Sequence, residues 1–201
     1  AAVATAIAEQ FSNPEDVIKG KNILLRDVIL ELLKSIIRND RQTADLVIKE
    51  LESELSLNLT LENGVTVGLH GVADRVDFTE NILRIIDYKT GQVNINKSLD
   101  IEKIFSDVKF KAVFQAFYYA YLYKRMKSAG TIKAGIYNLP RANSGINFLS
   151  NDQVLSQEQI AQFEFELKQL LGQIFDQQIP FRQTDDENRC TWCAYSDICH
   201  R

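Results

Sequence analysis

The apolar positions of the first quarter of the chain follow a helical period. Between residues 16 and 38, apolar residues recur every three to four positions. This spacing predicts one helix, or two helices that join near Gly20. We expect a second helix over roughly residues 43–55. The N-terminal part of the chain is therefore predicted to be helical.

The pattern then changes to a period of two, which is typical of strands. Apolar and polar residues alternate on both sides of Asn63-Gly64, a dipeptide that favours tight hairpin turns. A second turn near residues 79–81 leads into the apolar stretch ILRIIDYK at 82–89. Residues 57–89 therefore predict a three-stranded meander with tight turns.

Helices and strands alternate in the rest of the chain. We expect a long aromatic-rich helix at 109–127, strands at 131–140 and 146–149, and an amphipathic helix at 156–177. Ser156 opens the last helix, with Gln159 at the capping-box position. The order of elements predicts a mixed α/β or α+β fold.

The amino-acid composition is that of an ordinary globular protein. The chain has 201 residues, of which 45% are hydrophobic and 25% charged, with only 3 prolines and 9 glycines. We expect one domain over residues 1–201, cut from a longer protein because the first residue is not Met, with a cysteine-containing tail at 180–201. No apolar run is long enough for a membrane span, so no membrane partner is expected.

The net charge of the chain limits the classes of function that we expect for this protein. A net charge of −4 excludes the uniformly basic character of many nucleic-acid-binding proteins, but it allows a local basic groove. Residues 101–133 contain seven Lys or Arg and two acids. This charge pattern is typical of a basic surface that contacts the phosphate backbone of a nucleic acid. The alternative is that these charges lie on a solvent-exposed helix face.

The three cysteines lie close together, at Cys190, Cys193 and Cys199. An odd, clustered set is not a disulfide framework, so we expect a reducing, cytoplasmic location. The spacing C-x2-C-x5-C is typical of a metal or iron–sulfur site. The alternative is that the cysteines bind no metal and are small buried residues.

Two aspartates and a lysine stand out on the predicted strands. Asp74 shares a strand face with Val72 and Val76, which are expected in the core, and Asp87 shares a face with Lys89. Antiparallel pairing of the two strands brings these groups together. Carboxylates are the ligands that Mg²⁺ prefers, and a neighbouring lysine can stabilise negative charge during phosphodiester hydrolysis. A buried Asp–Lys ion pair is the structural alternative.

These residues lie within two characteristic sequence motifs. GVADRVD at 71–77, followed by IIDYKTG at 85–91, resembles the RecB-like branch of the PD-(D/E)XK nuclease superfamily, which includes RecB and AddB nuclease domains. The resemblance implies a restriction-endonuclease-like α/β core, a mixed sheet flanked by helices. It implies that Asp74 and Asp87 bind Mg²⁺ or Mn²⁺ with the backbone carbonyl of Tyr88, and that Lys89 is catalytic.

The resemblance extends to the helix that follows these strands. Gln115 and Tyr119 match a Q-x-x-x-Y element, and their spacing places both on one helix face. The resemblance implies that this face positions DNA, and an aromatic core helix is the alternative. Arg75 and Asp77 belong to the same string but point away from Asp74 by strand alternation, so we expect them to form a structural ion pair.

The chain departs from this branch in two places. The cysteine triad resembles that of AddB-type nucleases, in which a fourth, upstream cysteine completes a 4Fe-4S cluster. Here no cysteine precedes Cys190, so the fourth ligand could be His200 or lie upstream of the chain. The branch also carries a histidine on its N-terminal helices, where this chain has Arg26 and Asp27. Three helix-borne acids could serve instead, at Glu31, Glu50 and Glu54, and His70 could approach the site or be structural.

The residues therefore predict metal-dependent phosphodiester hydrolysis, and the resemblance implies that the protein is a deoxyribonuclease. The resemblance implies an exonuclease of RecB/AddB type in DNA repair or recombination, with DNA as substrate and a helicase subunit as partner. The alternative is a catalytically inactive nuclease-fold module that binds DNA or scaffolds such a partner. No P-loop motif occurs in the sequence, so any helicase activity belongs to another segment or chain.

Overall fold

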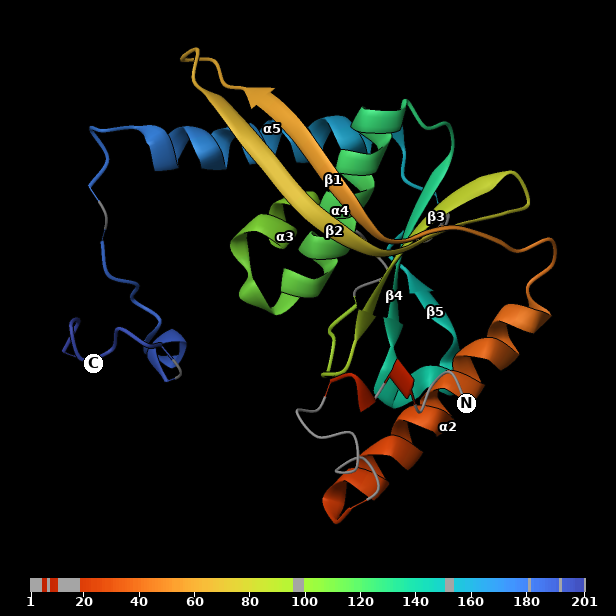
Figure 1. Ribbon diagram of the computed structural model, residues 1–201. Coiled ribbons are helices and arrows are strands. Elements are labelled where there is room, and N and C mark those ends of the chain that lie inside the picture. Colours follow the sequence, from red (N-terminus) through yellow and green to blue (C-terminus); the bar gives the residue numbers. More distant parts are fainter. Residues whose placement is uncertain are drawn as a thin grey trace.

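A five-stranded sheet forms the centre of the protein. The structure, a computed structural model, describes residues 5–6, 8–10, 19–95, 100–150, 154–180, 182–191 and 193–200. The strands are β1 (Val47–Thr60), β2 (Thr66–Thr79), β3 (Ile82–Lys89), β4 (Ile132–Asn138) and β5 (Ile146–Phe148), side by side in that order (Figure 1). β3 and β4 are parallel, and the other neighbouring strands are antiparallel.

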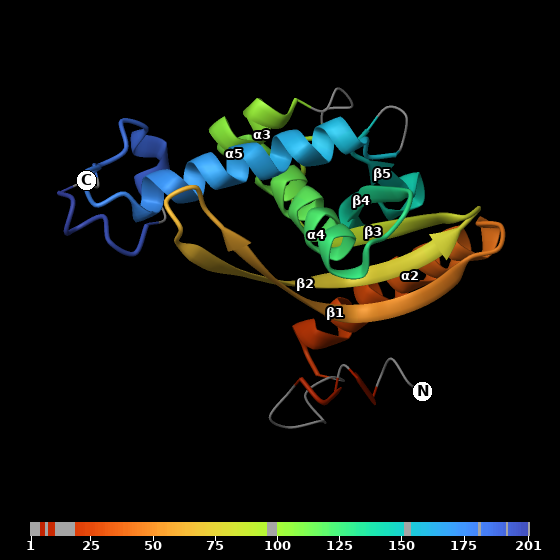
Figure 2. The ribbon, with the colours of Figure 1, turned by 90° about the horizontal axis from the view of Figure 1, so that it is seen from above.

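Helices cover both faces of this sheet. They are α2 (Lys21–Gln42), α3 (Ile101–Ser106), α4 (Lys111–Lys127) and α5 (Gln157–Phe175), with short 3-10 helices η2 (Val108–Phe110), η3 (Leu139–Ser144) and η4 (Glu187–Cys190). Seen from above, α3, α4 and α5 lie on one side and α2 on the other (Figure 2). The expected fold, a mixed sheet flanked by helices, is confirmed. None of the described helices is both long and apolar enough to cross a lipid bilayer.

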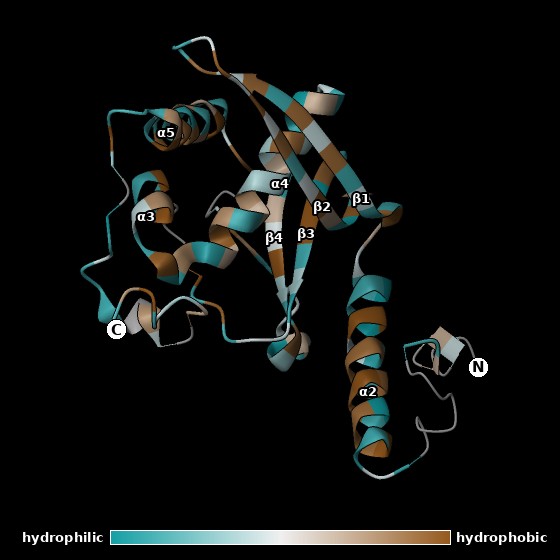
Figure 3. Cartoon of the chain, turned by 60° about the vertical axis from the view of Figure 1, so that its left-hand side comes forward, coloured by the Kyte–Doolittle hydropathy of each residue, from teal (hydrophilic) through white to brown (hydrophobic). Residues whose placement is uncertain are grey.

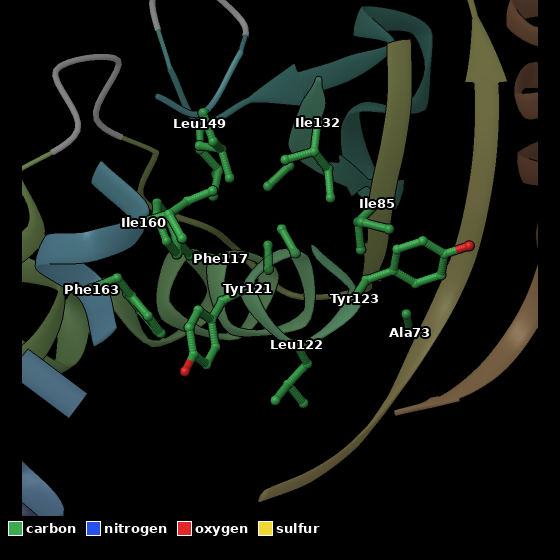
Figure 4. Close-up of a cluster of buried hydrophobic side chains, with 14 of the residues drawn as sticks. Ala73, Ile85, Phe117, Tyr121, Leu122, Tyr123, Ile132, Leu149, Ile160 and Phe163 are labelled. Atoms are coloured by element: carbon green, nitrogen blue, oxygen red, sulfur yellow. The ribbon is translucent and has the colours of Figure 1, made fainter. Parts of the chain in front are cut away.

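The main core lies between the sheet and the pair α4 and α5. Phe117 of α4 stacks on Phe163 of α5, Tyr121 of α4 packs against Phe163 at a tilt, and all three are fully buried. Ile85 of β3 and Ile132 of β4 close this cluster from the sheet side (Figure 4). Burial of this apolar surface stabilises the fold and fixes α4 against the sheet.

Most predicted elements are present, including the long helix, the last two strands and the amphipathic helix. The Ser156 capping box is formed as expected. Both turns of the meander are also present, and the second places Glu80 and Asn81 in the left-handed region, with φ of 51° and 61°. Two successive residues of this kind match the twist of an antiparallel hairpin.

The predicted helix at 43–55 is wrong, because residues 43–46 form a turn and residues 47–55 are the first part of β1. Val47, Ile48 and Leu51 suggest a helical period, but they end up about half or more exposed. The residues that β1 buries, Leu55 and Leu59 among them, alternate as in a strand. Pairing with β2 along the whole hairpin overrides the local pattern.

Within the described residues 19–46, the predicted helix is present as α2. It begins at Lys21, directly after Gly20, whose φ of 53° excludes a helical continuation through that residue. The part of the prediction before residue 19 lies outside the described residues. Apolar bands run along α2 (Figure 3), and Leu24 and Val28 are 69% and 47% exposed.

A buried network of charges joins α2 to the sheet. Arg75 of β2 donates to Asp77 at 2.7 Å and, from both terminal nitrogens, to Asp40 of α2 at 2.8 and 3.0 Å. Arg84 of β3 also donates to Asp77, which is fully buried. The expected Arg75–Asp77 ion pair is thus present, on the sheet face opposite α4. Pairing is required here because an unpaired buried charge is strongly destabilising.

Replacing Asp77 with asparagine should therefore destabilise the protein. Asp77→Asn leaves two buried guanidinium groups without their shared carboxylate, so we expect a loss of about 3–5 kcal/mol in the free energy of unfolding by urea. Glu31→Gln is the matched control, because Glu31 pairs with Lys34 on the exposed surface of α2. We expect a change within about 0.5 kcal/mol there. Equal effects of the two variants would contradict the structural role of Asp77.

Candidate active site

Two aspartates on neighbouring strands, Asp74 and Asp87, meet at the backbone of Tyr88. The Tyr88 N–H of β3 donates to Oδ2 of Asp74 in β2 at 2.7 Å. Asp87 precedes Tyr88 and is 1% exposed. Burial raises the pKa of the Asp87 carboxyl, the Lys89 ammonium opposes this rise, and the nearby charge of Asp74 adds to it. The structure therefore brings together the two carboxylates that the sequence singled out.

Lys89 connects these carboxylates to α4. Its Nζ lies 2.7 Å from Oδ2 of Asp87 and donates to Oε1 of Gln115 at 2.7 Å. The Gln115 side-chain amide in turn donates to the Tyr119 hydroxyl at 2.7 Å. A continuous row of polar contacts thus runs from Asp87 through Lys89 to the helix. All five predicted site residues, Asp74 included, belong to one neighbourhood.

One oxygen of this neighbourhood is unsatisfied. Oδ2 of Asp87 is buried and lies 2.7 Å from the Lys89 Nζ, but no group in the described residues makes a hydrogen bond of good geometry to it. Leaving a buried carboxylate oxygen without a hydrogen bond is costly, and a metal ion would relieve that cost. Mg²⁺ usually takes one or two protein carboxylates, so Asp74, Asp87 and the Tyr88 carbonyl fit such an ion.

The arrangement of Asp74 differs from the sequence expectation in one detail. Val76 is fully buried as predicted, but Val72 is 41% exposed because Ala73 takes the core position there. His70 is likewise exposed, and its backbone carbonyl accepts a hydrogen bond from the Tyr118 hydroxyl.

A hollow of about 590 Å³ opens beside Lys89. The end of β3 and the loop after it, residues 88–93, form one side, and Lys111, Ala112 and Gln115 of α4 form the other. Of the seven Lys and Arg residues in segment 101–133, Lys111 is the one that lines this hollow. Two others are engaged elsewhere: Lys124 donates to the carbonyls after α4, and Arg125 pairs with Glu164. The basic segment therefore does not form one continuous wall.

Gly71, the first residue of the G-x-x-D string, has a steric role. A Cβ at this position would lie 2.7 Å from Cε1 of Tyr119, closer than real Cβ contacts. A side chain on β2 here would force the Tyr119 ring, and with it the bond to Gln115, to move. The glycine of the string therefore allows α4 to approach β2 closely.

The candidate acids of the N-terminal segment do not join the site. Glu50 and Glu54 are on β1 and not on a helix, and Glu50 accepts a hydrogen bond from Tyr123. Glu31 pairs with Lys34 on the surface, and Arg26 pairs with Asp27.

The sequence patterns did not point to Asp40, although it holds Arg75, which also donates to the Tyr88 hydroxyl at 3.2 Å. No local motif marks Asp40, because its partner lies 35 residues away.

The cysteine tail shows no assembled metal centre. The three cysteines are free thiols, and the Cys193 N–H donates to the Cys190 carbonyl at 3.0 Å in a local turn. Across the part of the chain that the structure describes, no three His, Cys, Asp or Glu side chains are grouped as metal ligands. The 4Fe-4S cluster therefore has no support beyond the spacing of the cysteines.

Adding a methyl group at Gly71 should disturb the site without unfolding the domain. We expect Gly71→Ala to displace Tyr119 and to lower any activity that needs the Gln115–Tyr119 pair by about tenfold, the equivalent of one hydrogen bond. Gly130→Ala is the control, because nothing lies within 4 Å of a Cβ there. Proton NMR of the Tyr119 ring reports its displacement directly, and an unmoved ring would contradict this account.

The raised pKa of Asp87 has a consequence for stability. A carboxyl whose pKa is higher in the folded than in the unfolded state destabilises the fold above both values, and this cost disappears as the pH falls below them. Without metal, Asp87→Asn should therefore unfold at a higher temperature than the wild type at pH 7, and the difference should shrink on acidification. Exposed Asp27→Asn is the control. A pH-independent difference between Asp87→Asn and the wild type would refute this cause.

Comparison with known proteins identifies the family of this chain. The family model described as the PD-(D/E)XK nuclease superfamily matches residues 1–200. A comparison with curated proteins gives no match. One similar solved chain, described as the crystal structure of SSO0001, shares 16% identity over 98% of this chain and 77% of that chain, with a TM-score of 0.37. The family match spans nearly the whole sequence, and the chain therefore belongs to the PD-(D/E)XK nuclease superfamily.

Proposed function

We propose that this protein is a divalent-metal-dependent nuclease that hydrolyses phosphodiester bonds of DNA. The observation that carries the proposal is the buried Asp87 carboxylate, whose Oδ2 lies 2.7 Å from the Lys89 ammonium without a hydrogen bond of good geometry in the described residues. Superfamily membership gives this pair a chemical context, because its members are typically metal-dependent nucleases. A purely structural ion pair would instead satisfy its buried oxygens.

Each residue of the site has a separate task in this proposal. Asp74, Asp87 and the Tyr88 carbonyl would hold Mg²⁺ or Mn²⁺, which when bound polarises the phosphate and lowers the pKa of water. Lys89 stabilises the negative charge that develops on the phosphate oxygens. Gln115 holds the Lys89 ammonium in place, and Tyr119 holds Gln115.

The finer assignment rests on the motif strings. GVADRVD, IIDYKTG and Q-x-x-x-Y together support a RecB/AddB-type exonuclease that acts in DNA repair or recombination beside a helicase subunit. The hollow next to Lys89, with Lys111 on its wall, supports a nucleic-acid substrate, because a lysine there can neutralise a phosphate.

Cleavage of end-labelled DNA tests the proposal. With Mn²⁺ or Mg²⁺ we expect the wild type to cut single- or double-stranded DNA, and EDTA to abolish cutting. Lys89→Ala should cut about 10²–10⁴-fold more slowly, the range typical of a lost catalytic side chain. Lys103→Ala is the matched control, because Lys103 is exposed and pairs with Asp100 away from the site.

Metal binding provides the second arm of this test. Asp87→Ala should lose the Mn²⁺-induced rise in unfolding temperature that the wild type shows, because it removes a ligand. DNA binding that ignores both metal and Asp87, with no cutting, would support the alternative of an inactive nuclease-fold module. Cutting that persists in Lys89→Ala would overturn the assigned site.

A further inference from the structure

Asn138, the last residue of β4, is a buried polar residue to which the proposed reaction assigns no role. It is 7% exposed, and its Oδ1 is buried with no hydrogen-bond partner in the described residues. A buried acceptor of this kind is costly, and native proteins rarely keep one without a reason. Only one other such side-chain oxygen occurs in the described residues, and that is Oδ2 of Asp87.

The sheet register places Asn138 beside the catalytic lysine. β3 and β4 are parallel, with Lys89 opposite Asn138 and Asp87 opposite Ile136. Ile136 belongs to the core cluster under α4, whereas Tyr137 belongs to the smaller cluster on the α2 side. Because successive strand residues alternate between faces, Asn138 is on the α4 face, the same face as Lys89 and Asp87.

Lys89 needs an additional acceptor when the site holds a metal. Its ammonium has three N–H donors and no acceptor, and one donor is used by Gln115. A metal ion on Oδ2 of Asp87, which lies 2.7 Å from the same ammonium, would repel Lys89 and weaken its hold on that oxygen. A Lys89 side chain that gives up Asp87 is left with unused donors in a half-buried place.

We propose that Asn138 is a positioning residue of this site, whose Oδ1 accepts a hydrogen bond from the Lys89 ammonium when Asp87 holds a metal. The two strands are neighbours, with a typical spacing of about 4.8 Å, so rotation within the flexible lysine side chain can span the distance. The inference rests on the proposed function, because it gives Lys89 and Asp87 the roles argued above.

Asn138→Leu tests this inference, because leucine has nearly the same shape and no acceptor. Removing an unsatisfied buried group should leave the unfolding temperature of the metal-free protein unchanged or higher. We expect the Kd for Mn²⁺ measured by calorimetry to rise about tenfold. We also expect kcat for DNA cleavage to fall about 10- to 100-fold, with KM for DNA within about twofold, since a charge-assisted hydrogen bond is lost.

Two further variants separate the acceptor from the shape of the side chain. Asn138→Asp keeps an acceptor oxygen at nearly constant volume. Because only the geometry of the hydrogen bond changes, we expect the cleavage rate to stay within about fivefold of the wild type. Asn58→Leu, at an exposed position of β1, is the control for the substitution itself and should leave both Kd and kcat unchanged.

The possible outcomes distinguish this inference from the proposed function. Unchanged Mn²⁺ affinity and kcat in Asn138→Leu would overturn it, as would a lower unfolding temperature or an equal loss in Asn138→Asp. If the wild type binds Mn²⁺ but cuts no DNA, the proposed function fails, while weaker Mn²⁺ binding in Asn138→Leu still supports the place of Asn138. A wild type that binds no Mn²⁺ overturns both.

Discussion

The position of the Tyr88 peptide is the constraint on which the rest of the site depends. On the α4 face, its N–H is bonded to Asp74, and the residues on either side of it, Asp87 and Lys89, face the helix. On the opposite face, its hydroxyl accepts a hydrogen bond from Arg75, and its ring packs near Tyr137. One residue is therefore held by polar contacts from both sides of the sheet.

Buried charged side chains are stabilised to different extents on the two faces of the sheet. On the α2 face, Arg75 is satisfied by carboxylates: burial opposes its charge, but hydrogen bonds with Asp40 and Tyr88 outweigh that cost and raise its pKa. On the α4 face, burial raises the pKa of Asp87, and the Lys89 ammonium offsets only part of that rise. A complete network makes a rigid support, whereas an incomplete one leaves a carboxylate ready for a further cation.

Helix α4 completes the site because it packs tightly at two points. Its aromatic residues fill the core around Phe163, and the absence of a side chain at Gly71 lets Tyr119 lie against β2. The polar row from Tyr119 through Gln115 to Lys89 is thus positioned by apolar packing, which is non-directional but closely fitted. Stability of the core and geometry of the site are determined by the same helix.

The sequence by itself determined the hairpins, the later helices and strands, and the five residues that the structure brings together. These follow from local rules, namely strand alternation, turn dipeptides, helix spacing and motif strings that lie within a few residues of one another. The tertiary structure alone decided that residues 47–55 form a strand, that Val72 is exposed, and that Asp40 and Asn138 lie beside Arg75 and Lys89. Each of these depends on pairing between segments far apart in the chain, whose energy exceeds local preference and leaves no local pattern in the sequence.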